Sequence, residues 1–176
     1  MAVILSAQCT DARVNKVTPV LFSHYGTPRS MAQADPAHLE RLIHSTGFFR
    51  SKARNLQGAA RRIVTEHDGQ VPKTMDALCA LPGVARKTAN VVLYNAFRRN
   101  EGIAVDTHVI RVANLLHLTR QADPNKIEKD LTAVVPEADW GDFTHLVIDH
   151  GRAICVARRP RCEQCFLNDL CPSSRV

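Results

Sequence analysis

The chain has 176 residues, of which 45% are hydrophobic, and it carries a formal net charge of +6. This composition supports a buried core and excludes a largely disordered chain, and an aromatic content of 5% argues against a large β-sandwich or barrel. No run approaches about 18 apolar residues, so no membrane span is expected. The basic balance favours a polyanionic partner, although charge alone is a weak indication.

The first residues, MAVIL, are too short an apolar run for a signal peptide and lack a basic flank. We therefore expect a cytoplasmic chain, in a compartment where stable disulfides are uncommon. An apolar helical pattern begins at once, without a Ser, Thr, Asp or Asn cap before it. Two interpretations stay open: a frayed N-terminus, or a preceding segment that is absent from this chain.

Helical periodicity dominates the rest of the chain, and no alternating strand pattern or repeat is present. One apolar face runs through Val3, Ile4, Ala7 and Val14, and a second ends before Gly26. The later predicted helices cover 35–47 (with an Asp-Pro start), 51–69, 74–83, 86–97, 106–118, 123–136 and 139–155. We predict an all-α fold with two lobes, 1–99 and 100–176, joined at the polar segment 98–102.

The segment LPGVARKTANVV at 81–92 places a Pro-Gly turn directly before a helix. Backbone N–H groups at such a helix start form an anion site, and they suit DNA phosphate because amides read no base. An ordinary helix–turn–helix corner is the alternative. Arg86 and Lys87 lie in the first turn, where the helix dipole disfavours cations. Lys87 is therefore either a phosphate contact or a partly desolvated amine, whose neutral form is a nucleophile.

Asp106 stands directly before the helical pattern THVIRVANLL. An aspartate in this position is most simply a helix N-cap. A carboxylate can also stabilise the positive charge that develops on a sugar during glycosidic cleavage. His108 is either a phosphate contact or a surface residue.

Six cysteines are present, and two of them, Cys9 and Cys79, fit helical patterns as small core residues. The other four form the motif C-x6-C-x2-C-x5-C, which suits a single metal centre: Cys155, Cys162, Cys165 and Cys171. Disulfides are disfavoured by the expected compartment. Structural zinc usually takes two C-x2-C knuckles, or one knuckle with a His pair. One knuckle with uneven arms favours an iron–sulfur cluster, with zinc as the main alternative.

This cysteine motif at the end of an all-α chain resembles the cluster motif of the endonuclease III family of DNA glycosylases. LPGVARKTANVVL resembles that family's helix-hairpin-helix, VDTH its catalytic aspartate segment and LSAQCTD its N-terminal helix. The matches run from about residue 2 to residue 171. The resemblance implies a two-lobed helix-hairpin-helix glycosylase fold. The hairpin would lie at about 74–97 in a helical barrel lobe, and a [4Fe-4S] cluster at 155–171 in the second lobe.

The resemblance also implies roles for single residues. Lys87 falls on the catalytic lysine and Asp106 on the catalytic aspartate, and the four clustered cysteines fall on the cluster ligands. Gln8 falls on a polar plug and Phe48 on a wedge that enters duplex DNA, whereas Phe49 is either core or a contact. Further DNA contacts are implied at the hairpin, at the second lobe and in the cysteine loop: Gly83, Ala85, Arg86, His108, Arg158, Arg159 and Arg161.

Three details of this implied site carry alternatives. Ala85 stands where the family usually has glycine, so the hairpin would grip phosphate slightly differently. The three arginines of the cysteine loop either contact phosphates or offset the charge of the cluster. The hairpin carbonyls of Cys79, Leu81 and Val84 match positions that hold a monovalent cation in the family and its relatives.

The resemblance implies a monomeric, bifunctional enzyme acting on double-stranded DNA with a damaged base, at the nucleoid if the source is bacterial. It would remove oxidised pyrimidines and cut the abasic strand by β-elimination through a lysine Schiff base. A monofunctional mismatch glycosylase is one alternative, and Lys87 speaks against it. A non-enzymatic iron–sulfur DNA-binding protein is another, and the joint presence of Lys87 and Asp106 makes it less favoured.

Overall fold

The structure, a computed structural model, describes all residues from Met1 to Val176 and contains helices and no strands. The predicted all-α class is therefore confirmed. The chain forms two compact units, Met1–Val92 and Leu93–Val176. Their boundary lies inside helix α7 (Arg86–Phe97), and the segment 98–102 follows the end of that helix. None of the helices combines the length and the apolar character needed to cross a membrane.

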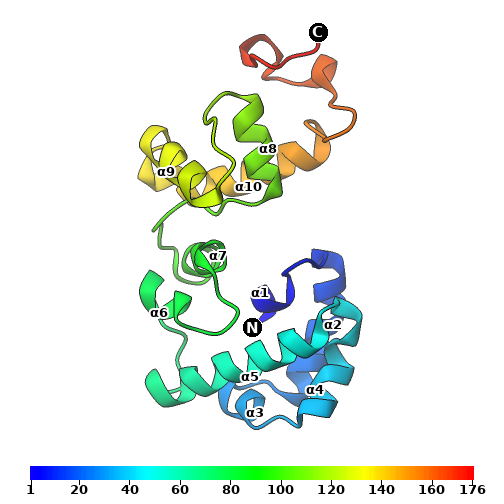
Figure 1. Cartoon of the computed structure of the whole chain (residues 1–176), viewed down its shortest axis with the longest axis vertical. Helices are drawn as coiled ribbons and strands as arrows, with labels where there is room; N and C mark the ends of the chain where they lie inside the picture. The colour runs from blue at the N-terminus through cyan, green and yellow to red at the C-terminus, as the bar shows by residue number, and fades with distance from the viewer. The chain divides into compact units, whose positions relative to one another are not determined.

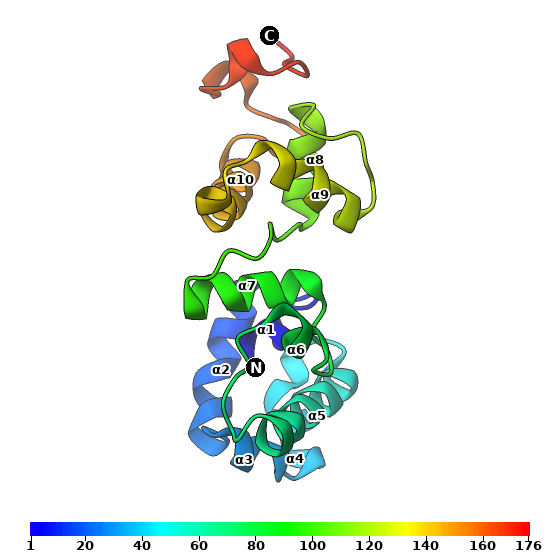
Figure 2. The ribbon, with the colours of Figure 1, turned by 90° about the vertical axis from the view of Figure 1, so that its left-hand side faces the viewer.

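The first unit contains six helices and the beginning of α7 (Figures 1 and 2). They are α1 (Ala2–Leu5), α2 (Asp11–His24), α3 (Pro28–Ala32), α4 (Pro36–Ile43), α5 (Phe49–Glu66) and α6 (Met75–Cys79), with a 3-10 turn η1 (His44–Thr46) between α4 and α5. The long helix α5 packs on α1, α3 and α4. Leu21, Leu39, Ile43 and Leu56 are fully buried and form the centre of this unit.

Local signals explain where these helices begin. Asp35 accepts a hydrogen bond from the His38 N–H at 2.9 Å and Pro36 follows it, so the predicted Asp-Pro start is confirmed. The apolar face expected through Val3 and Val14 is interrupted, because the chain leaves the helix after α1 and passes through Gln8 at φ 50°. Helix α3 was not predicted, since five residues are too few to show a period.

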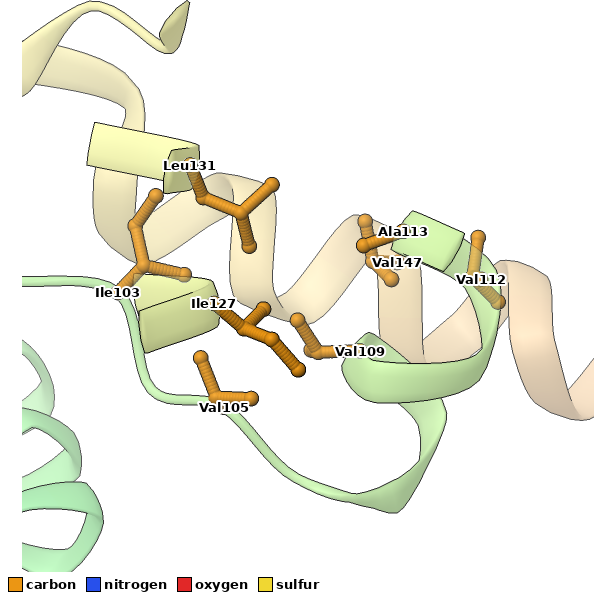
Figure 3. Close-up of a cluster of buried hydrophobic side chains, with 8 residues drawn as sticks. All are labelled: Ile103, Val105, Val109, Val112, Ala113, Ile127, Leu131 and Val147. Carbon is orange, nitrogen blue, oxygen red and sulfur yellow. The ribbon is translucent and has the colours of Figure 1, made fainter. Parts of the chain in front are cut away.

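The second unit is built around α8 (Thr107–Leu115), α9 (Pro124–Val134) and α10 (Trp140–Ala153), with 3-10 turns η2 (Glu137–Asp139), η3 (Cys162–Gln164) and η4 (Asn168–Leu170). Eight apolar side chains from the three long helices and the segment before α8 meet in its core, as Figure 3 shows: Ile103, Val105, Val109, Val112, Ala113, Ile127, Leu131 and Val147.

Two glycines of α10 set how closely its neighbours approach. A Cβ at Gly141 would lie 2.1 Å from Cδ2 of Tyr94, so only glycine leaves room for that ring. A Cβ at Gly151 would lie 3.1 Å from both His108 Nδ1 and Arg111 Nη2, two atoms of α8. The close contact of α8 with α10 therefore fixes the first turns of α8, where Asp106 and His108 lie.

Candidate active site and metal centre

The hairpin between α6 and α7 is a compact turn. The Leu81 N–H donates to the Leu78 carbonyl at 3.0 Å, and the Val84 N–H donates to the Leu81 carbonyl at 3.1 Å. Gly83 has φ 76°, in the left-handed region that glycine adopts without strain. The turn leads directly into α7, so the amide groups at the start of that helix lie beside an exposed Gly83.

Helix α5 packs against this turn through three residues on one of its faces, Asn55, Gly58 and Arg62. A Cβ at Gly83 would lie 2.8 Å from Asn55 Nδ2, and a Cβ at Gly58 would lie 3.1 Å from Pro82 Cγ. Arg62 donates through Nη1 to the Ala80 carbonyl and also pairs with Glu66. Sequence reasoning missed these supports, although their spacing at i, i+3 and i+7 is that of a helix face.

Lys87 is the second residue of α7, and its side chain is exposed, as is that of Arg86. The Ala89 N–H donates to the Ala85 carbonyl at 2.9 Å, which places Ala85 at the helix start with its methyl group exposed. The predicted position of Lys87 in the first turn is confirmed. The expected partial desolvation of Lys87 is wrong for the free chain, because its side chain is exposed.

Asp106 caps α8 through a single carboxylate oxygen. Oδ1 accepts from the His108 N–H at 2.8 Å and from the Val109 N–H at 2.9 Å. The predicted N-cap is therefore confirmed, and both capping bonds leave Oδ2 outside the cap. The Asp106 side chain is half-buried. His108 is also half-buried, with Nδ1 3.4 Å from Arg111 Nη2, so it packs against α10 and is not a free surface residue.

Gln8 and Phe48 share an unusual backbone conformation. Their φ values are 50° and 47°, in the left-handed region that residues with a Cβ rarely adopt. Both side chains are exposed, and Phe48 retains 67% of its accessible surface, which excludes the core alternative for it. Phe49 is half-buried and lies against His44, with ring centroids 4.5 Å apart. Each loop therefore directs one large side chain away from the unit.

The four clustered cysteines line one cavity of about 210 Å³: Cys155, Cys162, Cys165 and Cys171. All are free thiols, which argues against the disulfide alternative. Four thiols around one cavity are the ligand set that an iron–sulfur cluster takes.

Two side chains that sequence reasoning missed also line this cavity. Arg111 donates through Nη2 to the carbonyls of Gly151 and Cys155, both at 2.9 Å, and its buried Nε has no protein partner. His150 Nε2 lies 3.8 Å from Cys165 Sγ. Burial raises the pKa of the Cys155 thiol, and the Arg111 guanidinium opposes this shift. An unused buried donor beside four thiols suits an anionic cluster.

The remaining predicted positions are accessible. Arg158, Arg159 and Arg161 are exposed, and the Arg161 N–H donates to the Ile154 carbonyl at 3.0 Å. Cys9 is half-buried and lies outside a helix, and Cys79 is exposed, so the expectation of two core cysteines is wrong. The Leu81 carbonyl, one of three proposed cation ligands, already accepts the bond from Val84.

Residues 1–137 match the family of HhH-GPD superfamily base excision DNA repair proteins, and residues 155–171 match the iron–sulfur binding domain of endonuclease III. The chain is 56% identical over 176 residues to endonuclease III of Synechocystis sp., covering 100% of this chain and 80% of the relative. The chain belongs to the endonuclease III family. As a member of this family, it carries a [4Fe-4S] cluster in its cysteine segment.

Solved structures of endonuclease III agree with this assignment. A non-covalent endonuclease III–DNA complex is 45% identical, with a TM-score of 0.92, and the match covers 98% of this chain and 80% of that one. A trapped covalent intermediate of endonuclease III with DNA gives the same identity and TM-score, with 98% and 81% covered. The predicted helix-hairpin-helix glycosylase fold with a cluster segment is therefore confirmed.

Proposed function

We propose that this endonuclease III homologue is a bifunctional DNA glycosylase of base-excision repair, with Lys87 as its nucleophile and Asp106 as its catalytic carboxylate. The observation that carries the proposal is the position of Lys87: an exposed amine one residue inside the helix that follows the Gly83 turn. Amides of the turn would hold the phosphate next to the damaged nucleotide, and Lys87 would then lie beside its sugar.

The reaction needs the neutral amine of Lys87. The Lys87 side chain is exposed in the free chain, so the sugar of a bound nucleotide can reach its amine. The amine attacks C1′, the C1′–N bond breaks, and the base leaves with the electron pair and takes up a proton. The amine then loses a proton, the C1′–O4′ bond breaks and O4′ takes up a proton, so the sugar ring opens to a Schiff base between Lys87 and C1′. Loss of a C2′ proton expels the 3′ phosphate and cuts the strand.

Asp106 has two tasks in this scheme. Oδ1 holds the first turn of α8, and the carboxylate stabilises the positive charge that develops on the sugar as the base leaves. It also accepts the proton that the Lys87 amine loses. The proposed partner is a double-stranded DNA with an oxidised pyrimidine, bound by a monomer at the nucleoid of a bacterial cytoplasm.

The cluster segment has a supporting task. Cys155, Cys162, Cys165 and Cys171 would hold the [4Fe-4S] cluster, and Arg158, Arg159 and Arg161 would contact phosphates. When bound, the cluster supplies four thiolate bonds that fix the segment. The exposed arginines between Cys155 and Cys162 would then contact the DNA phosphates from a segment that is held in a fixed shape.

Borohydride trapping on a duplex with one oxidised pyrimidine tests the roles of both residues. Lys87→Gln should abolish trapping and strand cutting while DNA binding persists, because glutamine keeps the side-chain bulk without the amine. Asp106→Asn should slow base removal by about 10²-fold or more and act less on a preformed abasic site, since asparagine still caps the helix. Arg86→Gln is the matched control, and it should weaken binding but retain trapping. A Lys87→Gln protein that still traps would refute the assignment.

A further inference from the structure

Lys52 is a buried cation on α5 to which the proposed reaction gives no task. Its side chain is 4% exposed, although lysines are almost never buried this deeply unless they are paired. Its ammonium group donates to the Leu5 carbonyl at 2.9 Å and to the Thr46 carbonyl at 2.7 Å. Both partners are therefore backbone groups, distant in sequence from each other.

These two carbonyls belong to the loops that present Gln8 and Phe48. Leu5 is the last residue of α1, and the left-handed Gln8 follows three positions later. Thr46 is the last residue of η1, and Gly47 and Phe48, both with positive φ, follow it. Leu5 and Thr46 are themselves buried, at 0% and 2% exposure. One ammonium group thus holds the backbone at the start of both loops, at Leu5 and at Thr46.

An ammonium group in this place is costly. Burial lowers the pKa of Lys52, and the nearby Cys9 opposes this shift. Charge-assisted hydrogen bonds to two carbonyls are shorter and stronger than neutral ones. An apolar side chain would fill the space, but it would leave the spacing of the loops undetermined and two buried carbonyls unbonded. The two hydrogen bonds therefore fix the spacing of the two loops, although burying a charged group costs free energy.

We propose that Lys52 is a positioning residue that ties the Gln8 and Phe48 loops together, so that both side chains enter the gap left by an extruded nucleotide. This inference rests on the proposed function, since a gap arises only when a base leaves the duplex. Lys52 does not touch the DNA. It acts through the backbone at Leu5 and Thr46.

Single-turnover excision of thymine glycol tests the inference, with the lesion either paired in a duplex or in the isolated strand. Lys52→Met keeps the apolar stem and removes both hydrogen bonds. We expect the duplex rate to fall at least about tenfold relative to the single-strand rate, because only the duplex leaves a gap to fill. Lys52→Gln is a second variant with a shorter donor, which keeps the test available if methionine prevents folding.

Ile63→Ala is the matched control, because Ile63 is a buried residue of α5 at 3% exposure with no hydrogen bond to either loop. It should lower thermal stability and reduce both rates in parallel. A Lys52 variant that behaves in the same way, with an unchanged ratio of duplex to single-strand rates, would show that Lys52 only supports the fold.

A double-mutant cycle adds a second readout. If Lys52 acts through these two loops, Lys52→Met should change the rate ratio by no more than about twofold in a background that carries both Gln8→Ala and Phe48→Ala. A fully additive loss would overturn the inference. Borohydride trapping of the wild-type protein on an abasic strand keeps the two proposals apart: its absence contradicts the proposed function, whereas trapping with an unchanged rate ratio contradicts the role of Lys52 alone.

Discussion

The hairpin at 78–86 and the cysteine segment at 155–171 are both short, largely irregular stretches with proposed DNA contacts, but they are held in different ways. The hairpin buries Leu78 and Leu81 at 2% and 4% exposure, and α5 supports it from below. No residue after Gly151 is buried, and the cysteine segment contains only two three-residue 3-10 turns. Packing alone can therefore shape the hairpin, whereas the cysteine segment depends on ligand bonds for its shape.

Removing one ligand should give the largest effect and separates the two regions most sharply. Cys162→Ala should lose the cluster iron and the amide exchange protection of 155–171, because cluster binding is coupled to folding of the segment. Residues 1–92 should keep their protection. Iron analysis and hydrogen exchange check this, with Cys79→Ala as a cysteine control outside the segment. Full iron content with unchanged exchange in Cys162→Ala would contradict the comparison.

A methyl group at Gly83 should disturb the hairpin without affecting the cluster. Gly83→Ala meets a strained φ of 76° and an Asn55 Nδ2 atom 2.8 Å from the new Cβ. We expect a loss of about 1–3 kcal/mol in the free energy of unfolding, measured by chemical denaturation, with unchanged iron content. Gly69→Ala is the control, because Gly69 has the same φ and no atom within 4 Å of its Cβ position. Equal losses at both sites would show that Asn55 does not support the turn.

Removing positive charge from the cysteine segment should show whether this region binds phosphate through arginine side chains, whereas the hairpin is proposed to bind phosphate through backbone amides. Replacing Arg158, Arg159 and Arg161 together by glutamine should lower the slope of log affinity against log salt by up to about three. Stability should change little, since all three side chains are exposed. Titrations of duplex DNA at several salt concentrations measure the slope. An unchanged slope would assign the arginines to the charge of the cluster instead.

The smallest expected effect is at Ala85. Ala85→Gly removes an exposed methyl group at the start of α7 and lets a phosphate approach the amides more closely. We expect DNA affinity to rise by about two- to fivefold, or roughly 0.4–1 kcal/mol. Binding isotherms at fixed salt provide the measurement. Weaker binding by the glycine variant would indicate that helix propensity at this position matters more than access.

The sequence predicted those parts of the molecule that depend on local chemistry. Helix periodicity and caps such as Asp35 and Asp106 depend on residues that are close in sequence, and both caps form as expected. The bond from Lys52 to Leu5 and the bonds from Arg111 to Gly151 and Cys155 join residues 40 or more positions apart, so no local pattern contains them. The exposure of Lys87 was mispredicted because charge at a helix end says nothing about which side chains cover it.

The left-handed backbone at Phe48 has a consequence for engineering. A glycine there would relieve the strain of φ 47° and remove an exposed aromatic ring, two changes that favour a more heat-resistant and more soluble protein. The same glycine would remove one of the two side chains that we propose enter the gap left by an extruded nucleotide, and only Gln8 would remain. Screens that select only for thermal stability would therefore select against Phe48. The variants that they yield would be stable and soluble proteins with low repair activity.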